Sequence, residues 1–135
     1  MTIYVTAALP TTADSSGLVT KNIPCDSTVY VGAFVYMDSG TAYNGIATSV
    51  QTSNIIGIVI SKATATTCNI LLAGITPGFF VGLDDTKNYF LSETVAGAMQ
   101  DFPPPATVPN ILINLGKAFD DTKFKVEIGK QLVRV

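Results

Sequence analysis

The sequence predicts an all-β fold, a small antiparallel β-barrel or β-sandwich. Val, Ile, Thr, Tyr and Phe dominate the chain, and these are the residues enriched in strands. Gly, Pro, Asn or Asp interrupts them every several residues, which is the spacing of short strands joined by turns. Few windows have the apolar period of a helix. The length of 135 residues is normal for one domain with a single core.

Nine segments have the composition of strands, and each is bounded by turn-forming residues. Their spacing of roughly 8–12 residues suits a small sandwich or a closed barrel. The segments are Thr2–Ala7, Thr28–Tyr36, Tyr43–Val50, Ile55–Ser61, Thr67–Leu72, Asn88–Ser92, Ile111–Phe119, Phe124–Ile128 and Gln131–Val135.

Three connections carry specific turn signals. Asp-Ser-Gly within MDSGTAYNG, from Met37 to Gly45, predicts a tight hairpin between two strands. Pro77 and Gly78 occupy the central positions that a type II turn prefers. The segment DFPPPATVPN, residues 101–110, holds four of the seven prolines. We expect it to cross one end of the barrel as an extended, polyproline-like segment.

The first 24 residues form a segment of their own ahead of the barrel or sandwich domain, residues 25–135. The stretch LPTTADSSGLVTKNIP is rich in Thr, Ser and Pro and lacks a firm period. Two interpretations stay open: an extended arm that orders against a neighbouring subunit, or an edge strand followed by a loop. The N-terminus lacks the pattern of a signal peptide. The longest aliphatic run, IIGIVI, is far short of the roughly 20 residues of a membrane helix. We expect synthesis in the cytoplasm and no membrane partner.

The chain is unusually poor in charge. Hydrophobic residues make up 47% of the sequence and charged residues 13%, whereas an average soluble domain has about 25% charged residues. Because a neutral surface is easily desolvated on association, this deficit predicts contacts between subunits. The net charge is −2 and the eight basic residues are scattered, which argues against nucleic acid as a partner.

The residue types needed for several kinds of catalysis are missing. The sequence has no histidine, which excludes Ser-His-Asp and Cys-His nucleophiles and His-ligated metals. Cys25 and Cys68 are the only cysteines and form no CxxC pair, so we favour two reduced, buried thiols over a disulfide. Phosphate-binding glycine loops are also absent. We expect no catalytic residue, no metal ligand and no cofactor-binding residue, and thus no enzyme.

The tetrapeptide Asp-Asp-Thr-Lys occurs twice, at residues 84–87 and 120–123. Carboxylate catalysis requires two acids that converge across a cleft, whereas adjacent side chains in an extended chain point in opposite directions. A metal loop requires oxygen ligands at alternating positions, and the lysine would repel a cation. Aspartate at the first position of a β-turn caps N–H groups two residues on. We predict that both copies are turns in equivalent hairpins.

Four segments follow one another from about Val29 to the end of the chain: VGAFVYMDSG, SNIIGIVISKATATTCNILLAGIT, GLDDTKNYFLSETVAGAMQDFPPP and ILINLGKAFDDTKFKVEIG. Their order resembles a β module of tailed-bacteriophage virion proteins, found in small capsid decoration (cement or head-fibre) proteins and in tail fibres. The most specific part is LDDTKNYFLSETVAG, followed by a proline cluster and a Gly-Lys-Ala turn. The first twenty-odd residues lie outside the resemblance. The resemblance implies a virion component that is often trimeric and carries no catalytic residues.

The first hypothesis is a homotrimeric decoration protein on the capsid exterior, which binds the major capsid protein and stabilises the head. Shell contact by strand addition is expected from the N-terminal arm, and trimer contact from aromatic residues. The expected shell contacts are Ile3, Tyr4, Val5 and Leu9, and the expected subunit contacts are Phe79, Phe80, Tyr89 and Phe90. Because half the side chains of a strand face a core, at least one of Tyr89 and Phe90 is expected to pack there.

The alternative is a tail-fibre or receptor-binding module that recognises a host surface glycan. Its stacking platforms would be Tyr43, Tyr89 or Phe102, beside Asn and Asp hydrogen-bonding groups. A carboxylate glycosidase would need two converging acids, and no sequence feature supports it.

Overall fold

The computed structural model describes residues 3–4, 16–104 and 110–134, which form twelve strands and no helix. The expected all-β class is confirmed. Within these residues no helix is long and apolar enough to cross a membrane. The strands are β1 (Ile3–Tyr4), β2 (Ser16–Pro24), β3 (Phe34–Asp38), β4 (Thr41–Asn44), β5 (Gly57–Thr64), β6 (Thr67–Ile75), β7 (Asn88–Leu91), β8 (Met99–Gln100), β9 (Asn110–Leu112), β10 (Asn114–Ala118), β11 (Phe124–Val126) and β12 (Leu132–Arg134).

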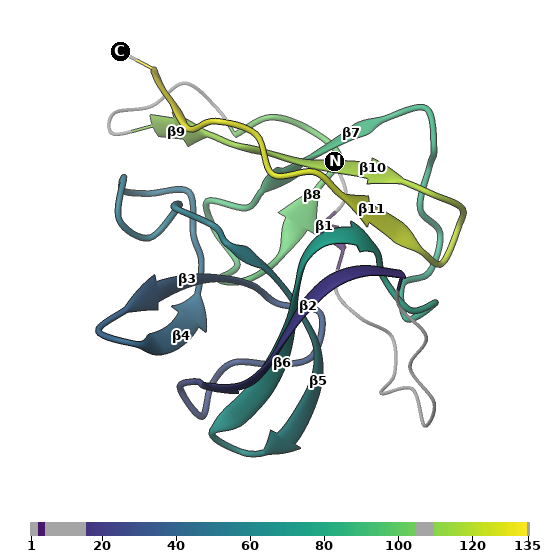
Figure 1. Ribbon diagram of the computed structural model, residues 1–135. Coiled ribbons are helices and arrows are strands. Elements are labelled where there is room, and N and C mark those ends of the chain that lie inside the picture. The colour runs from purple at the N-terminus through teal and green to yellow at the C-terminus, as the bar shows by residue number, and fades with distance from the viewer. Residues whose placement is uncertain (1–2, 5–15, 105–109, 135) are drawn as a thin grey trace.

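Ten of the strands form one antiparallel sheet in the order β1-β8-β7-β10-β11-β6-β5-β3-β4, and β2 pairs with β6 beside this path. The sheet curls strongly into a half-barrel (Figure 1). β9 and β12 form a separate two-stranded sheet. The two end strands, β1 and β4, are not neighbours in the order, so strand pairing alone does not close the barrel.

Loop hydrogen bonds join the two ends of the curled sheet. The connection between β7 and β8 is hydrogen-bonded to the start of β3: the Phe34 N–H donates to the Gly97 carbonyl at 2.9 Å. The Gly97 N–H donates in turn to the Gly45 carbonyl at 2.6 Å, just after β4. The Ala47 N–H donates to the Ser92 carbonyl at 3.0 Å. These three hydrogen bonds connect the two ends of the sheet, which strand pairing does not connect.

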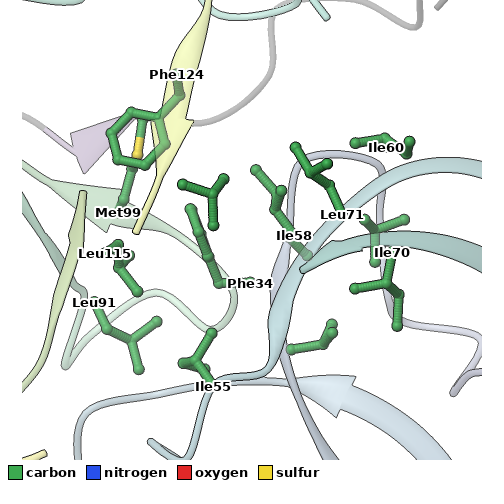
Figure 2. Packing of buried hydrophobic residues seen from close by; sticks show 14 of the residues in the cluster. Phe34, Ile55, Ile58, Ile60, Ile70, Leu71, Leu91, Met99, Leu115 and Phe124 are labelled. Atoms are coloured by element: carbon green, nitrogen blue, oxygen red, sulfur yellow. The ribbon is translucent and has the colours of Figure 1, made fainter. Parts of the chain in front are cut away.

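The core gathers buried side chains from most strands of the large sheet. The ring of Phe124 makes edge-to-face contacts with the rings of Phe34, Phe80 and Tyr89, at centroid distances of 6.0, 6.3 and 5.5 Å. Figure 2 shows Phe34 between aliphatic side chains of β5 and β6 and apolar side chains of β7, β8 and β10. The labelled neighbours are Ile58, Ile60, Ile70 and Leu71 on the first side, and Leu91, Met99 and Leu115 on the second.

The described part of the first 24 residues belongs to the sheet of the main domain. β1 pairs with Gln100 and Met99 of β8. β2 runs along the whole of β6, in a segment that lacks the sequence pattern of a strand. Two register shifts, between Leu18 and Val19 and between Thr20 and Ile23, break the alternation of apolar and polar residues that would have revealed this strand. Both interpretations of the first 24 residues stay predictions, because residues 5–15 lie outside the described part.

Three expected strands differ markedly from the observed ones. The segment expected over Thr28–Tyr36 forms a strand only from Phe34, because turns interrupt the residues before it. The one expected over Tyr43–Val50 is β4, which begins at Thr41 and ends at Asn44, before a run of turns. The single strand expected over Ile111–Phe119 divides at Ile113 into β9 and β10, which belong to different sheets.

The hairpin predicted in MDSGTAYNG is present between β3 and β4. Asp38 pairs with Thr41, and the two loop residues, Ser39 and Gly40, have φ values of 52° and 81°. Positive φ at both central positions is the signature of the type I′ turn, which matches the twist of the adjoining strands.

The type II turn predicted at Pro77-Gly78 is wrong, since Gly78 lacks the required positive φ. The Pro77 carbonyl instead accepts from the Phe79 N–H and from the Thr76 hydroxyl, both at 2.9 Å. The Thr76 hydroxyl also accepts from the Phe124 N–H at 2.9 Å, which ties this bend to β11. The polyproline-like crossing stays a prediction, because residues 105–109 lie outside the described part.

Candidate functional site

The first Asp-Asp-Thr-Lys copy is a turn, as predicted. The Asp84 carboxylate accepts from the Thr86 N–H at 2.9 Å and from the Thr86 hydroxyl at 2.6 Å. The Lys87 N–H donates to the Asp84 carbonyl at 3.2 Å, which closes the turn. The Asp84 N–H donates to the Tyr89 hydroxyl at 2.8 Å, and because the Tyr89 side chain is buried, this bond anchors the turn to the core.

The second copy is also a turn, and it closes the hairpin between β10 and β11. The Asp120 carboxylate accepts from the N–H groups of Thr122 and Lys123 at 2.9 and 2.8 Å, and from the Thr122 hydroxyl at 3.2 Å. The Phe119 N–H donates to the Lys123 carbonyl at 2.8 Å. The same residue pattern therefore produces the same side-chain cap twice.

The two hairpins are not equivalent, which corrects the prediction. The chain before the first copy forms no strand, and it pairs instead with the second copy. The Phe80 N–H donates to the Thr122 carbonyl, and the Leu83 N–H donates to the Asp121 carbonyl, both at 3.0 Å. The two turns therefore lie side by side, although 36 positions separate them in the sequence.

A hollow of about 520 Å³ lies where the two turns meet. Each turn contributes three corresponding residues to its lining, the two aspartates of the copy and the apolar residue that precedes them. The lining residues are Leu83, Asp84, Asp85, Phe119, Asp120 and Asp121. We call this hollow the acidic hollow.

Hydrogen bonds favour the ionised form of two of these carboxylates. The pKa of Asp84 lies below its ordinary value because its carboxylate accepts from the hydroxyl and the N–H of Thr86. The pKa of Asp120 is lowered by the N–H groups of Thr122 and Lys123. The Lys87 ammonium contacts the largely buried Asp101 carboxylate at 3.2 Å. At neutral pH the Asp84 and Asp120 carboxylates are therefore negatively charged, and Lys87 and Lys123 lie close enough to interact with them.

The chemistry of the hollow suits hydrogen-bond donors and cations rather than phosphates. The side chain of Phe119 is 52% exposed and stands beside the carboxylates, so the hollow combines an aromatic surface with acceptor oxygens. Among the described residues, no three Asp, Glu or Cys side chains group closely enough to hold a metal ion.

Three of the four residues expected at a subunit interface lie in the core instead. Phe79, Phe80 and Tyr89 are buried within the single chain, and Phe90 is half-buried. The side chains of the first three are thus not on the surface that a neighbouring subunit would meet, because they fill the interior around Phe124. The expectation that at least one of Tyr89 and Phe90 packs in the core is confirmed.

The residues expected to contact a capsid divide into two groups. Ile3 and Tyr4 form β1 at one end of the sheet order. Val5 and Leu9 lie outside the described residues.

The residues expected to stack on a glycan are not brought together as an open platform. Tyr43 is half-buried and stacks on Tyr36, with ring centroids 5.8 Å apart. Tyr89 is fully buried, so it has no free face, and Phe102 is half-buried.

An exposed apolar region near the C-terminus was not predicted from the sequence. Leu132 and Val133 of β12 are 54% and 52% exposed, although successive side chains of a strand point to opposite faces. The Gln131 amide donates to the Val50 carbonyl at 2.6 Å and to the Ser53 hydroxyl at 2.7 Å, which places exposed Val50 beside this strand. We call Val50, Leu132 and Val133 the C-terminal apolar region. The strand was predicted, but its exposure depends on tertiary position and leaves no local signal.

No protein-family model, no curated protein and no solved structure matches this chain. The function is therefore inferred from the geometry of its surface and the chemistry of its residues.

Proposed function

We propose that this chain is a structural component of a bacteriophage virion. In this role it is a decoration protein that binds the major capsid protein on the outside of the head and associates as a homotrimer. The observation that carries the proposal is the C-terminal apolar region. Leu132 and Val133 are exposed on a strand whose one partner among the described strands is β9. Exposed apolar side chains beside an unpaired strand edge mark a surface that another chain covers.

Subunit contact is proposed at the C-terminal apolar region, in place of the buried aromatic residues. A two-stranded sheet is marginally stable by itself, so the β9–β12 pair gains from a strand or side chains of another subunit. The charge content of 13% fits this role, because few ionised groups must lose water when such a surface is buried.

Contact with the capsid is proposed through the N-terminal strand. β1 ends the sheet order and pairs with β8 alone among the described strands. Among the described residues its second edge is unpaired, and we propose strand addition there, in which backbone hydrogen bonds supply affinity without charged residues. Ile3 and Tyr4 keep their proposed contact role, together with Val5 and Leu9 of the segment outside the described part.

The charge distribution supports an outward position on the particle. The acidic hollow gathers four of the ten acidic residues of the chain in one place. Phosphate groups are repelled by such a surface, whereas a DNA-facing protein needs clustered Lys and Arg. The proposed role is structural and includes no catalytic step.

Co-sedimentation with capsids that lack this protein tests the proposal. Purified protein is expected to pellet with the capsids in a saturable manner and to raise the temperature at which they disassemble. A truncation that removes residues 1–9 is expected to abolish pelleting and leave the melting temperature of the free protein almost unchanged. Failure of the intact protein to pellet at any concentration would overturn the capsid-binding role.

A second candidate function is supported by the acidic hollow. Exposed Phe119 beside four carboxylates has the composition of a carbohydrate subsite, with an aromatic face for stacking and oxygens that accept from hydroxyl groups. A receptor-binding module would use this hollow to bind a host surface glycan. Binding of labelled protein to host cells, lost in Phe119→Ala but kept in Val81→Ala, is the expected result for this candidate. Equal binding by both variants would exclude it.

A further inference from the structure

Cys68 lies on β6, and Cys25 directly follows β2, the strand that pairs with β6. Ile23 of β2 is opposite Cys68 of β6, and Pro24 is opposite Thr67. The Cys25 N–H donates to the Thr66 carbonyl at 2.9 Å, which continues this antiparallel register by one residue. Cys25 is thus opposite Thr66, two positions from Cys68. Because residues two apart in a strand share a face, the two thiols lie diagonally on the same side of the sheet.

Both thiols are enclosed together within the core. Cys25 is 3% exposed and Cys68 is 0% exposed, and both are free thiols. Burial raises the pKa of Cys68 to about 12, and the adjacent Cys25 thiol adds to this shift. Lys62 is paired with Cys68 in the register of β5, and its ammonium donates to the Val29 carbonyl at 2.6 Å.

We propose that Cys25 and Cys68 form an intramolecular disulfide when the folded chain meets a thiol–disulfide oxidant, which fastens the end of β2 to β6. One cysteine thiolate attacks a sulfur of a small disulfide such as oxidised glutathione, and one glutathione thiol leaves. The second cysteine then attacks the mixed disulfide and releases the other glutathione. Two protein thiols lose two protons and two electrons, and one oxidised glutathione becomes two reduced molecules.

The local structure allows the small adjustment that this bond requires. Diagonal cross-strand Cα atoms lie about 7–8 Å apart in a regular ladder, at or beyond the upper limit for a disulfide. The register of β2 shifts between Thr20 and Ile23, two residues before Cys25, and bulges of this kind bend and twist a strand locally. Cys25 itself follows Pro24, the last residue of β2, so it lies at the end of the ladder and not in its middle.

The bond would change the stability of the fold and not its shape. β2 lies outside the main path of the sheet, and its one partner among the described strands is β6. The disulfide would close a loop that contains β3, β4 and β5, and closing such a loop restricts the unfolded chain. Because both thiols are buried, oxidation must wait for β2 to open locally, and we expect it to be slow in the native state.

This chemistry does not depend on the proposed function. In a chain that is made in a reducing cytoplasm and later leaves it, the thiols would stay reduced during synthesis and join afterwards. The fold would then be strengthened only outside the cell.

The test is oxidation of the full-length, reduced protein with oxidised glutathione, with and without urea below the unfolding transition. The expected product is a single covalent chain whose intact mass has fallen by two hydrogens and which yields one non-reduced peptide linking Cys25 to Cys68. Its melting temperature is expected to rise by about 5–10 °C, and to return to the starting value after reduction. Urea is expected to speed the reaction, because it populates the opened strand.

Cys25→Ala and Cys68→Ala are the matched controls, and each is expected to show no rise in melting temperature on oxidation. The wild-type experiment stands by itself if either variant fails to fold. Three results would overturn the proposal: unreacted thiols or stable glutathione adducts in both conditions, a disulfide between two chains, or a melting temperature that falls when the intramolecular bond forms.

Discussion

The N–H of Leu83 donates to the carbonyl of Asp121 at 3.0 Å, and this bond joins the residue before one copy of a repeated tetrapeptide to the other copy. Each copy is capped by its first aspartate, so the repeat encodes a local turn. The contact between the copies is a property of the fold, because it arises where the chain before the first turn runs along the second. A repeat that looks like a duplicated hairpin thereby produces one acidic surface.

The Asp120 cap is expected to stabilise the hairpin between β10 and β11. Asp120→Ala removes the acceptor for two backbone N–H groups, those of Thr122 and Lys123, and should lower the melting temperature. Asp121→Ala is the matched control, since the bond from Leu83 uses the Asp121 backbone carbonyl, which this substitution retains. Thermal unfolding followed by circular dichroism measures both. Equal destabilisation by the two variants would contradict the assigned cap.

Stability is expected to fall in acid because of Asp84 and Asp120. Hydrogen bonds lower the folded-state pKa of each below the ordinary value of 3.8. A depressed folded pKa contributes stability above the unfolded pKa, and this contribution is lost as the pH falls through the folded pKa. The wild type should therefore exceed the double variant Asp84→Asn/Asp120→Asn in melting temperature near pH 7, with the gap closing below about pH 4. A gap that stays constant from pH 7 to pH 3 would show that these carboxylates do not govern the acid response.

Gly97, in the connection between β7 and β8, is expected to be hard to replace with any other residue. Its φ is +79°, and a Cβ there would stand 2.9 Å from the Tyr30 hydroxyl and 3.0 Å from the Ala33 Cβ. We expect Gly97→Ala to cost about 2–4 kcal/mol, from backbone strain and overpacking together. Gly40→Ala has a similar φ of +81° with no atom within 4 Å of the new Cβ, and should cost about 1 kcal/mol. Chemical denaturation compares the two, and equal costs would refute the crowding around Gly97.

Phe124 is expected to dominate the aromatic core. Its ring contacts the rings of Phe34, Phe80 and Tyr89, and its side chain is fully buried. Phe124→Ala should destabilise the fold by about 3–5 kcal/mol, because it leaves a cavity among rings that cannot collapse into it. The exposed residue Phe119 provides the control, and Phe119→Ala should change stability by about 0.5 kcal/mol or less. A small effect of Phe124→Ala in urea denaturation would place the core elsewhere.

The parts of the fold that were predicted from sequence are those with strong local signals. The β3–β4 hairpin follows from Asp-Ser-Gly, and the two capped turns follow from aspartate two residues before a threonine. β5, β6 and β7 follow from runs of β-branched and aromatic residues. In each case the physical cause lies within a few residues of its effect.

The features that were missed have non-local causes. β2 is held by its pairing with β6, and its bulges conceal the period by which a strand is recognised. Burial and exposure depend on which side of the curled sheet a side chain faces. This applies to the buried residues Phe79, Phe80 and Tyr89 and to the exposed residues Leu132 and Val133. The acidic hollow requires the contact between turns, and no pattern in either copy signals it.

The oligomeric state of the purified chain tests most directly whether its surface is built for association. Light scattering coupled to size exclusion at micromolar concentration is expected to give three times the mass of one chain. A Leu132→Glu/Val133→Glu variant is expected to give the mass of one chain, while Val81→Glu, which adds charge at another exposed site, stays trimeric. A wild-type protein that remains monomeric across this concentration range would contradict the proposed association of subunits.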